Sequence, residues 1–213
     1  MVNRKILSTV GAAALLFGIC ARVDAAPLVV FNFNDFNATA DVVAANMTST
    51  TFANAGGLDA DFLSGAARAR DWDTGNAAAA VAALDYWTFT LTADAGHTFD
   101  VASFSLDEWR DSHGPIELQF WANGAFIGSE ISTNTVSTNH LIVAPILGLT
   151  SLTVRIVAWD DSSNGSNSDL FVDNVTIEGI VRRQSDVTIP EPASLMLFGM
   201  GFALAARRLR SRA

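Results

Sequence analysis

Short runs in which apolar and polar residues alternate recur along most of this sequence, and they limit its possible folds more than any other feature. In Tyr86–Thr92 the Trp, Phe and Leu at odd-numbered positions fall on one face of an extended strand and the threonines on the other. Alternation with period two is typical of a strand with one buried face. Further runs of this kind are Leu28–Phe33, Thr98–Trp109, Ile116–Ala122, Phe126–Ile131, Val136–Val143, Leu152–Trp159 and Leu170–Ile180, with a short edge strand over 48–53. Eight or more short strands predict an all-β fold, a single β-sandwich of jelly-roll type.

Local signals add detail to this prediction. Asn123-Gly124 stands between two of the runs and predicts a tight hairpin turn. The alternation slips near Ala102-Ser103, which predicts a β-bulge. The exception to the strand pattern is Leu58–Leu84, rich in Ala and Gly, which fits either one short helix or a long loop across the end of the sandwich. We find no internal repeat and no sign of a second domain.

The first 25 residues have the organisation of a secretory signal peptide. Two basic residues precede the apolar run Ile6–Ile19, and Val23-Asp24-Ala25 predicts cleavage before Ala26. Cys20, the one cysteine of the chain, is then removed with the signal. The exported domain is therefore expected to have no disulfide and no Cys-based zinc site.

The last 25 residues combine three features in a fixed order. Pro190-Glu191-Pro192 is followed by the uncharged run Ala193–Ala206 and then by a group of arginines. As a helix, the 14-residue run would cover about 21 Å of the ~30 Å bilayer core, and arginine side chains would extend its reach. The arginines predict that this end stays cytoplasmic. The alternative is a buried core helix, which a terminal arginine cluster disfavours.

This tail resembles the PEP-CTERM sorting signal of Gram-negative bacteria. The residues that carry the resemblance are Pro190, Glu191, Pro192, Arg207, Arg208 and Arg210. The resemblance implies a transient anchor in the inner membrane, cleavage near Pro-Glu-Pro by an exosortase-type membrane protease, and delivery to the cell surface or extracellular matrix. Some domain catalogues also give this tail an ice-binding label, which implies no activity. The expected organisation is a signal peptide (1–25), a β-sandwich domain (26–182), a linker (183–189) and a sorting signal with a transmembrane helix (190–213).

The charge of the central domain limits its partners. Residues 26–189 include 20 acidic and 6 basic residues, a net charge of −14. Nucleic acid is therefore not an expected partner, because its binding needs a basic surface. The acidity fits the solubility of an exported protein, or the binding of a cation such as Ca²⁺.

A second resemblance covers most of the central domain. The stretches Tyr86–Asp111, Gly114-Pro115, Leu152–Trp159 and Asp169–Gly179, the last with Asp173-Asn174-Val175, are similar to those of galactose-binding and carbohydrate-module jelly rolls. This resemblance implies that the domain binds exopolysaccharide. Such modules can also hold a structural Ca²⁺ between the first strand and an Asp of the last strand.

Five residues are candidates for a sugar site. Trp121 shares a strand face with Glu117 and Gln119, and Trp159 shares one with Arg155. If the two strands are neighbours, these side chains line one surface, where an indole can cover the apolar face of a pyranose. The alternative is that either Trp fills a second core or covers its rim.

Asp173 is the main candidate for a metal ligand. Its strand position predicts that it shares a face with Phe171, Val175 and Ile177, where a carboxylate needs a partner. Ca²⁺, an arginine or backbone N–H groups are the alternatives, and the carbohydrate-module resemblance points to Asn34 and Asp35 as further calcium ligands. An Asp that caps a turn or lies at a wet edge would need none of these.

We expect no catalysis, since the sequence has no nucleophile elbow and no phosphate loop. Glu108 and Glu117 are two carboxylates that could flank a glycosidic bond if their separation allows it. Thr88, Thr90 and Thr92 form a ladder on one strand; an ice-binding plane would need this ladder on several stacked strands, and we find no other strand that repeats it. The hypotheses are thus a polysaccharide-binding module, a structural matrix protein without a defined ligand, and a glycoside-active enzyme.

Overall fold

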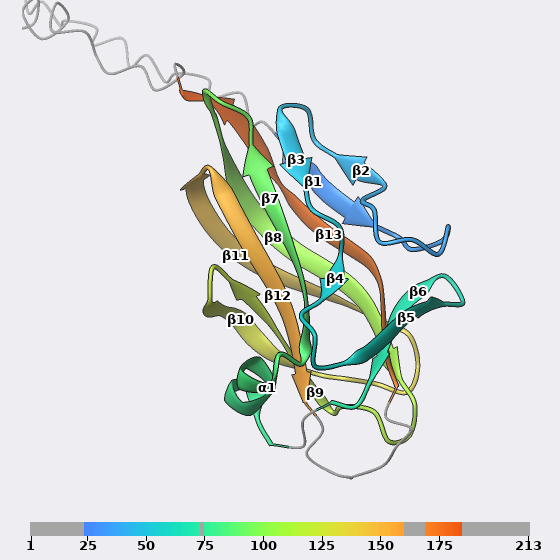
Figure 1. The fold of residues 1–213 in the computed structure, drawn as a ribbon. Coiled ribbons are helices and arrows are strands. Elements are labelled where there is room, and N and C mark those ends of the chain that lie inside the picture. The colour runs from blue at the N-terminus through green and yellow to red at the C-terminus, as the bar shows by residue number, and fades with distance from the viewer. Residues whose placement is uncertain (1–23, 73–74, 160–168, 185–213) are drawn as a thin grey trace, which may run out of the picture.

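Two antiparallel sheets packed face to face account for most of the chain in the computed structural model, which describes residues 24–72, 75–159 and 169–184 (Figure 1). Sheet A has the strand order β11-β8-β13-β1-β2, and β6 pairs with β13 and β5 with β6. Its strands are β1 (Ala26–Phe31), β2 (Val42–Val43), β5 (Asp59–Leu63), β6 (Ala66–Arg70), β8 (His97–Arg110), β11 (Thr138–Leu149) and β13 (Leu170–Arg183). The β-sandwich prediction is confirmed.

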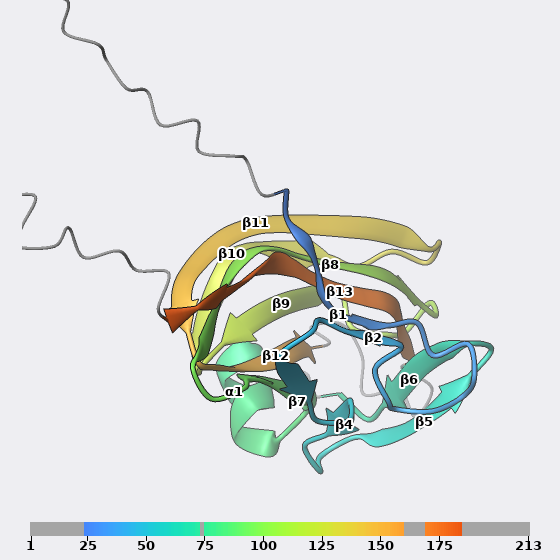
Figure 2. The ribbon, with the colours of Figure 1, turned by 90° about the horizontal axis from the view of Figure 1, so that it is seen from above.

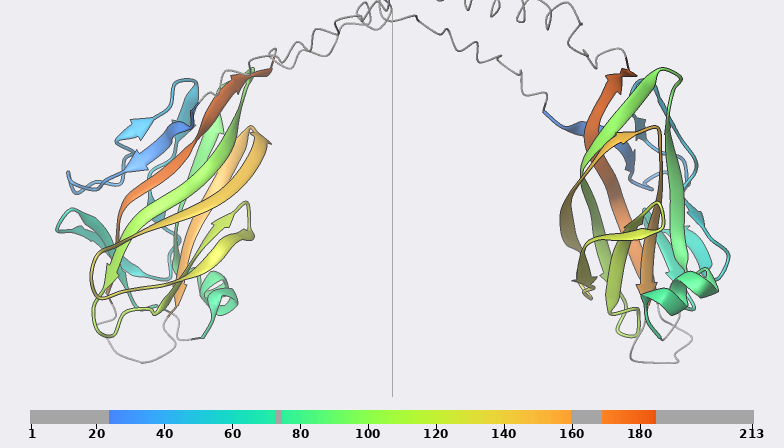
Figure 3. Two further views of the ribbon diagram at one scale, coloured as in Figure 1. Left: turned by 180° about the vertical axis from the view of Figure 1, so that it is seen from behind. Right: turned by 90° about the vertical axis from the view of Figure 1, so that its left-hand side faces the viewer.

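Sheet B has the order β10-β9-β12-β7-β3, and β4 pairs with β7. Its strands are β3 (Met47–Ser49), β4 (Ala53–Asn54), β7 (Tyr86–Ala93), β9 (Glu117–Ala122), β10 (Ala125–Ser132) and β12 (Ser151–Trp159). The helix α1 (Ala77–Ala83) lies against one end of sheet B on the side away from sheet A (Figures 2 and 3).

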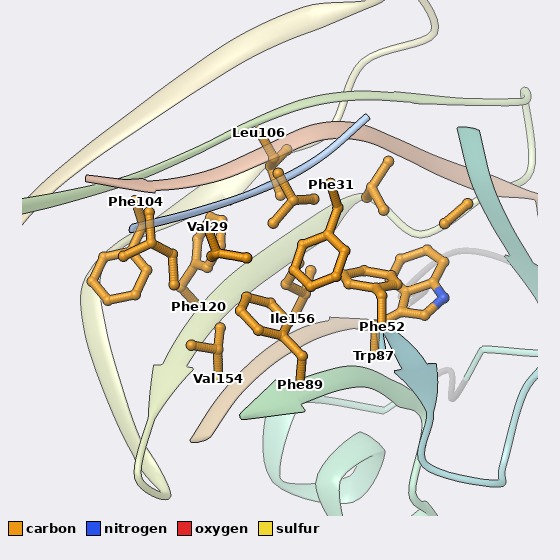
Figure 4. Close-up of a cluster of buried hydrophobic side chains, with 14 of the residues drawn as sticks. Val29, Phe31, Phe52, Trp87, Phe89, Phe104, Leu106, Phe120, Val154 and Ile156 are labelled. Carbon is orange, nitrogen blue, oxygen red and sulfur yellow. The ribbon is translucent and has the colours of Figure 1, made fainter. Parts of the chain in front are cut away.

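The core lies between the sheets and is rich in aromatic rings (Figure 4). Phe31 of sheet A and Phe89 of sheet B have ring centroids 4.8 Å apart, and Phe104 and Phe120 meet across the sheets at 5.8 Å. The alternating residues of β7 point inward as predicted. Because apolar burial is the main favourable term in folding, and no disulfide is expected in the exported domain, this core must supply the stability.

The local signals in the sequence are also confirmed. Asn123 and Gly124 both have positive φ, 49° and 83°, as the tight turns of hairpins require. In β8, Val101 pairs with Gly179 and Ser103 with Glu178, so Ala102 is the extra residue of a bulge.

The stretch 58–84 holds a helix, as one of the two alternatives predicted, and also a hairpin that was not predicted. Strands β5 and β6 meet through Ser64 and Gly65, which have φ values of 56° and 76°. Asn76 caps α1 by accepting hydrogen bonds from the backbone N–H groups of Ala78 and Ala79.

Among the described residues, no helix is long and apolar enough to cross a membrane. The predicted signal peptide up to residue 23, most of the linker and the whole sorting signal lie outside the described residues. The boundaries predicted for these segments therefore stay predictions.

Candidate functional site

The outer face of sheet B brings together the five residues predicted for a sugar site. Strands β9 and β12 are antiparallel neighbours, with Trp121 opposite Arg155 and Glu117 opposite Trp159. Gln119 lies between Glu117 and Trp121 on the same face. Since directly opposite residues of an antiparallel pair point to the same side, all five stand on the face turned away from the core.

A row of side chains crosses this face over four strands. Phe126 of β10 pairs with Trp121, and Thr88 of β7 pairs with Arg155. Phe126 is 42% exposed, while Trp121, Arg155 and Thr88 are partly buried. We call this row, Phe126–Trp121–Arg155–Thr88, the aromatic–arginine row.

Two contacts hold the row in place. The guanidinium carbon of Arg155 lies 4.9 Å from the centroid of the Tyr86 ring, a cation–π contact. The indole Nε1–H of Trp121 donates a hydrogen bond to Oε1 of Gln119 at 3.0 Å, which sets the direction of the ring. The row therefore presents a fixed indole beside a fixed cation.

Trp159 plays a different part from Trp121. It is 6% exposed and packs with Ala80 of α1, Tyr86 and Val157 in a small second cluster. The short alanine side chains of α1 let the helix approach the sheet closely. Trp159 thus fills a second core, one of the alternatives read from the sequence, and does not offer its ring to solvent.

Hydroxyl groups extend the surface beyond the row. On β12 and β3, Thr153 pairs with Thr90 and Thr48 pairs with Thr92. The Oγ1 atoms of Thr90 and Thr153 lie 3.0 Å apart. Sequence reasoning missed these flanking residues because it treated the ladder of β7 as isolated. The repeat in 48–50 (Thr-Ser-Thr) was the signal that could have found one of them.

Asp173 stands on the outer face of sheet A, and Phe171 shares that face as predicted, but the prediction that Val175 and Ile177 also share it is wrong. The register of β13 with β8 shifts between Asp173 and Thr176, and Asn174 has a φ of 50°. This irregularity reverses the alternation, which leaves Val175 and Ile177 in the core.

The Asp173 carboxylate accepts hydrogen bonds from the backbone N–H and side-chain amide of Asn174, at 2.7 and 3.3 Å. Burial raises its pKa, the Asn174 N–H opposes this, and the nearby carboxylates of Asp107 and Asp41 raise it further. The N–H donor is one of the three partner types predicted.

The other predicted calcium ligands bond locally in the loop after β1. The backbone N–H of Asn34 donates to Oδ1 of Asn32 at 3.1 Å, and the Asp35 carboxylate accepts from Asn37. Among the described residues, no three or more His, Cys, Asp or Glu side chains form a group that could hold a metal ion. Calcium binding therefore stays a prediction.

Glu108 and Glu117, the two carboxylates considered for glycoside cleavage, lie on opposite sides of sheet B. Glu108 is 0% exposed and points between the sheets, where it accepts a hydrogen bond from the Asn134 N–H and lies 3.0 Å from Nε2 of His140. Burial raises the pKa of Glu108, against the opposing effects of these two neighbours. Glu117 belongs to the outer face of sheet B, so the pair does not face a common substrate.

Comparison with known proteins decides the nature of the C-terminal tail. Residues 188–211 match the family model of the PEP-CTERM protein-sorting motif. The chain carries a PEP-CTERM sorting motif. All the predicted sorting residues, from Pro190 to Arg210, fall within the matched range. A protein with this motif is exported and is anchored in the membrane through its C-terminus before processing.

No curated protein matches the chain. Among solved structures, it is similar to a mutant of a family 29 carbohydrate-binding module, with 13% identity, a TM-score of 0.40, and coverage of 73% of this chain and 93% of that one. It is also similar to a family 22 xylan-binding domain from Paenibacillus barcinonensis, with 10% identity, a TM-score of 0.43, and coverage of 73% and 96%. A similarity this distant carries no ligand over to this chain.

Proposed function

We propose that this exported protein reaches the cell surface or extracellular matrix by the PEP-CTERM route and binds exopolysaccharide there, without catalysis. Its partners on the way are the inner membrane and an exosortase-type protease. The observation that carries the binding proposal is the aromatic–arginine row on the outer face of sheet B.

The chemistry of the row suits a sugar ring. An indole offers an apolar plane for the C–H face of a pyranose, while the neighbouring guanidinium and hydroxyl groups are hydrogen-bonding partners for sugar oxygens. The hydroxyls of Thr90 and Thr153 continue the surface along the strands. An open sheet face of this kind suits a polymer, whose successive units can lie along it.

The proposal predicts that Trp121→Ala weakens binding to polysaccharide about tenfold or more, because an anchoring Trp at a binding site commonly contributes over about 1.4 kcal/mol. The exported protein is tested on a glycan array, and each hit is measured by calorimetry. Trp109→Ala is the matched control, since Trp109 stacks on Phe171, with ring centroids 5.1 Å apart, on the outer face of sheet A.

The other outcomes identify the competing functions. If no glycan binds, the structural matrix protein without a ligand is favoured. Equal loss in both Trp variants would place the sugar elsewhere. If instead a polysaccharide is degraded and Glu117→Gln abolishes the turnover, the protein is a glycoside-active enzyme.

A further inference from the structure

We infer that the aromatic–arginine row selects an acidic sugar, a uronic acid unit whose carboxylate binds Arg155. This inference rests on the proposed polysaccharide site and names the class of ligand that the site takes. It comes from the way in which the domain distributes its few positive charges.

Three of the six arginines in the described residues, Arg68, Arg70 and Arg182, are paired with carboxylates. Arg68 and Arg70 both contact Asp169, at 3.4 and 3.5 Å, and each also pairs with an aspartate of β5. Arg182 pairs with Asp100 at 2.6 Å. Because residues 26–189 include 20 acidic and only 6 basic residues, a nearby carboxylate is the expected partner of an arginine.

Arg155, like Arg110 and Arg183, forms no ion pair with a carboxylate of the described residues, but it is the one of these three that belongs to the aromatic–arginine row. Its recorded contact is with the Tyr86 ring, and no salt bridge joins it to any carboxylate of the described chain. The acidic residue of β9 on the same face is Glu117, four positions from Trp121, or about 13 Å along the strand. The immediate neighbours across the strands are Trp121 and Thr88, which are uncharged.

The arrangement leaves a positioned positive charge beside an apolar plane. The Tyr86 ring supports the guanidinium from one side, and the planar fork of an arginine suits two parallel hydrogen bonds to a carboxylate. A uronic acid whose ring lies on Trp121 can direct its carboxylate at Arg155. A neutral sugar offers only hydroxyl acceptors, which gain less from the charge.

Binding of trigalacturonic acid and trimannuronic acid to the exported protein tests this inference, with the methyl esters of the same trimers as neutral controls. A hydrogen bond to a charged group contributes about 1.5–3 kcal/mol, so we expect the acids to bind about 10- to 100-fold more tightly than their esters. Arg155→Gln should remove this preference, so that each acid and its ester bind with affinities within about threefold of each other, and equal preference in the variant and the natural protein would contradict the role of Arg155. Arg155→Lys should keep part of the preference, because the charge remains without the fork.

The results separate this inference from the proposed function. If acids and esters bind equally, and Trp121→Ala weakens both, the acidic preference is overturned and the polysaccharide site stands. The acidic preference is also overturned, and the polysaccharide site stands, if neither trimer binds while a neutral polysaccharide binds and Trp121→Ala weakens that binding. If no glycan binds at all, both proposals fail. Should Arg155→Gln not fold, the comparison of acid and ester on the natural protein still decides.

Discussion

At the scale of single residues, the outer face of sheet A holds an unusual pair. Asp173 and Asp107 are directly opposite each other on β13 and β8. The amide groups of Asn174 and Asn139 each donate to Asp107 at 2.8 Å, which offsets part of the repulsion. Like charges directly opposite on neighbouring strands destabilise a sheet by about 0.2–1 kcal/mol. Removing one charge should therefore stabilise the fold.

Asp173→Asn should raise the free energy of unfolding by up to about 1 kcal/mol at pH 7. The folded protein holds the Asp173 proton more tightly than the unfolded chain does, so the carboxyl costs stability as the pH rises above its ordinary pKa of 3.8 towards its folded value. The gain should therefore vanish near pH 3. Urea unfolding at pH 7 and pH 3 measures the change in the free energy of unfolding. Asp94→Asn, at an exposed aspartate, is the control. If Asp173→Asn instead makes the protein less stable than the natural one, and does so only when Ca²⁺ is added, the predicted calcium site is supported.

At the scale of elements, α1 and Trp159 form a buried cluster with Tyr86 and Val157, and Trp121 of the row packs against its edge. Trp159→Ala should lower the free energy of unfolding by about 3–5 kcal/mol, as expected for a buried Trp. Trp121→Ala should cost far less, because Trp121 is partly exposed. Urea unfolding compares the two, and hydrogen exchange of the α1 amides shows whether the helix loosens. Equal stability losses would contradict this division of roles.

The sequence pattern predicted those elements whose conformation is set by residues close together in the chain. The alternation of Tyr86–Thr92 and the Asn123-Gly124 turn depend on residues close in the chain. The hairpin of β5 and β6 does not. Asp59-Ala60-Asp61 has little β propensity, and pairing of β6 with β13 and ion pairs to Arg68 and Arg70 support it.

The candidate site shows the same limit. The face shared by Trp121 and Gln119 follows from strand alternation, whereas the pairing of β9 with β12 needed the structure. The burial of Trp159 depends on α1, which is distant in sequence. The irregularity after Asp173 had a local signal, since Asn adopts positive φ more readily than most residues, but the apolar alternation on either side hid it.

At the scale of the whole molecule, the two ends of the sandwich differ. β1 begins beside the end of β13, with Ala26 opposite Gly179. Figure 1 shows α1 at the opposite end of the sandwich from the end of β13. The sorting motif therefore follows the end of the domain that lies away from α1.

The sorting motif makes the charge of the released protein predictable. The whole chain has a net charge of −9, and residues 26–189 have −14, because both predicted cleaved ends are basic. The released protein should therefore bind an anion-exchange column more tightly than the precursor, and intact-mass analysis should find it without Arg207 and Arg208. Replacing Pro190 and Pro192 by alanine should keep the chain in the membrane fraction with its tail, since the stiff segment at the cleavage site is lost. The variant Phe198→Leu preserves the apolar run and should be released normally.

If the released natural protein still carries Arg207 and Arg208, the tail is not cut.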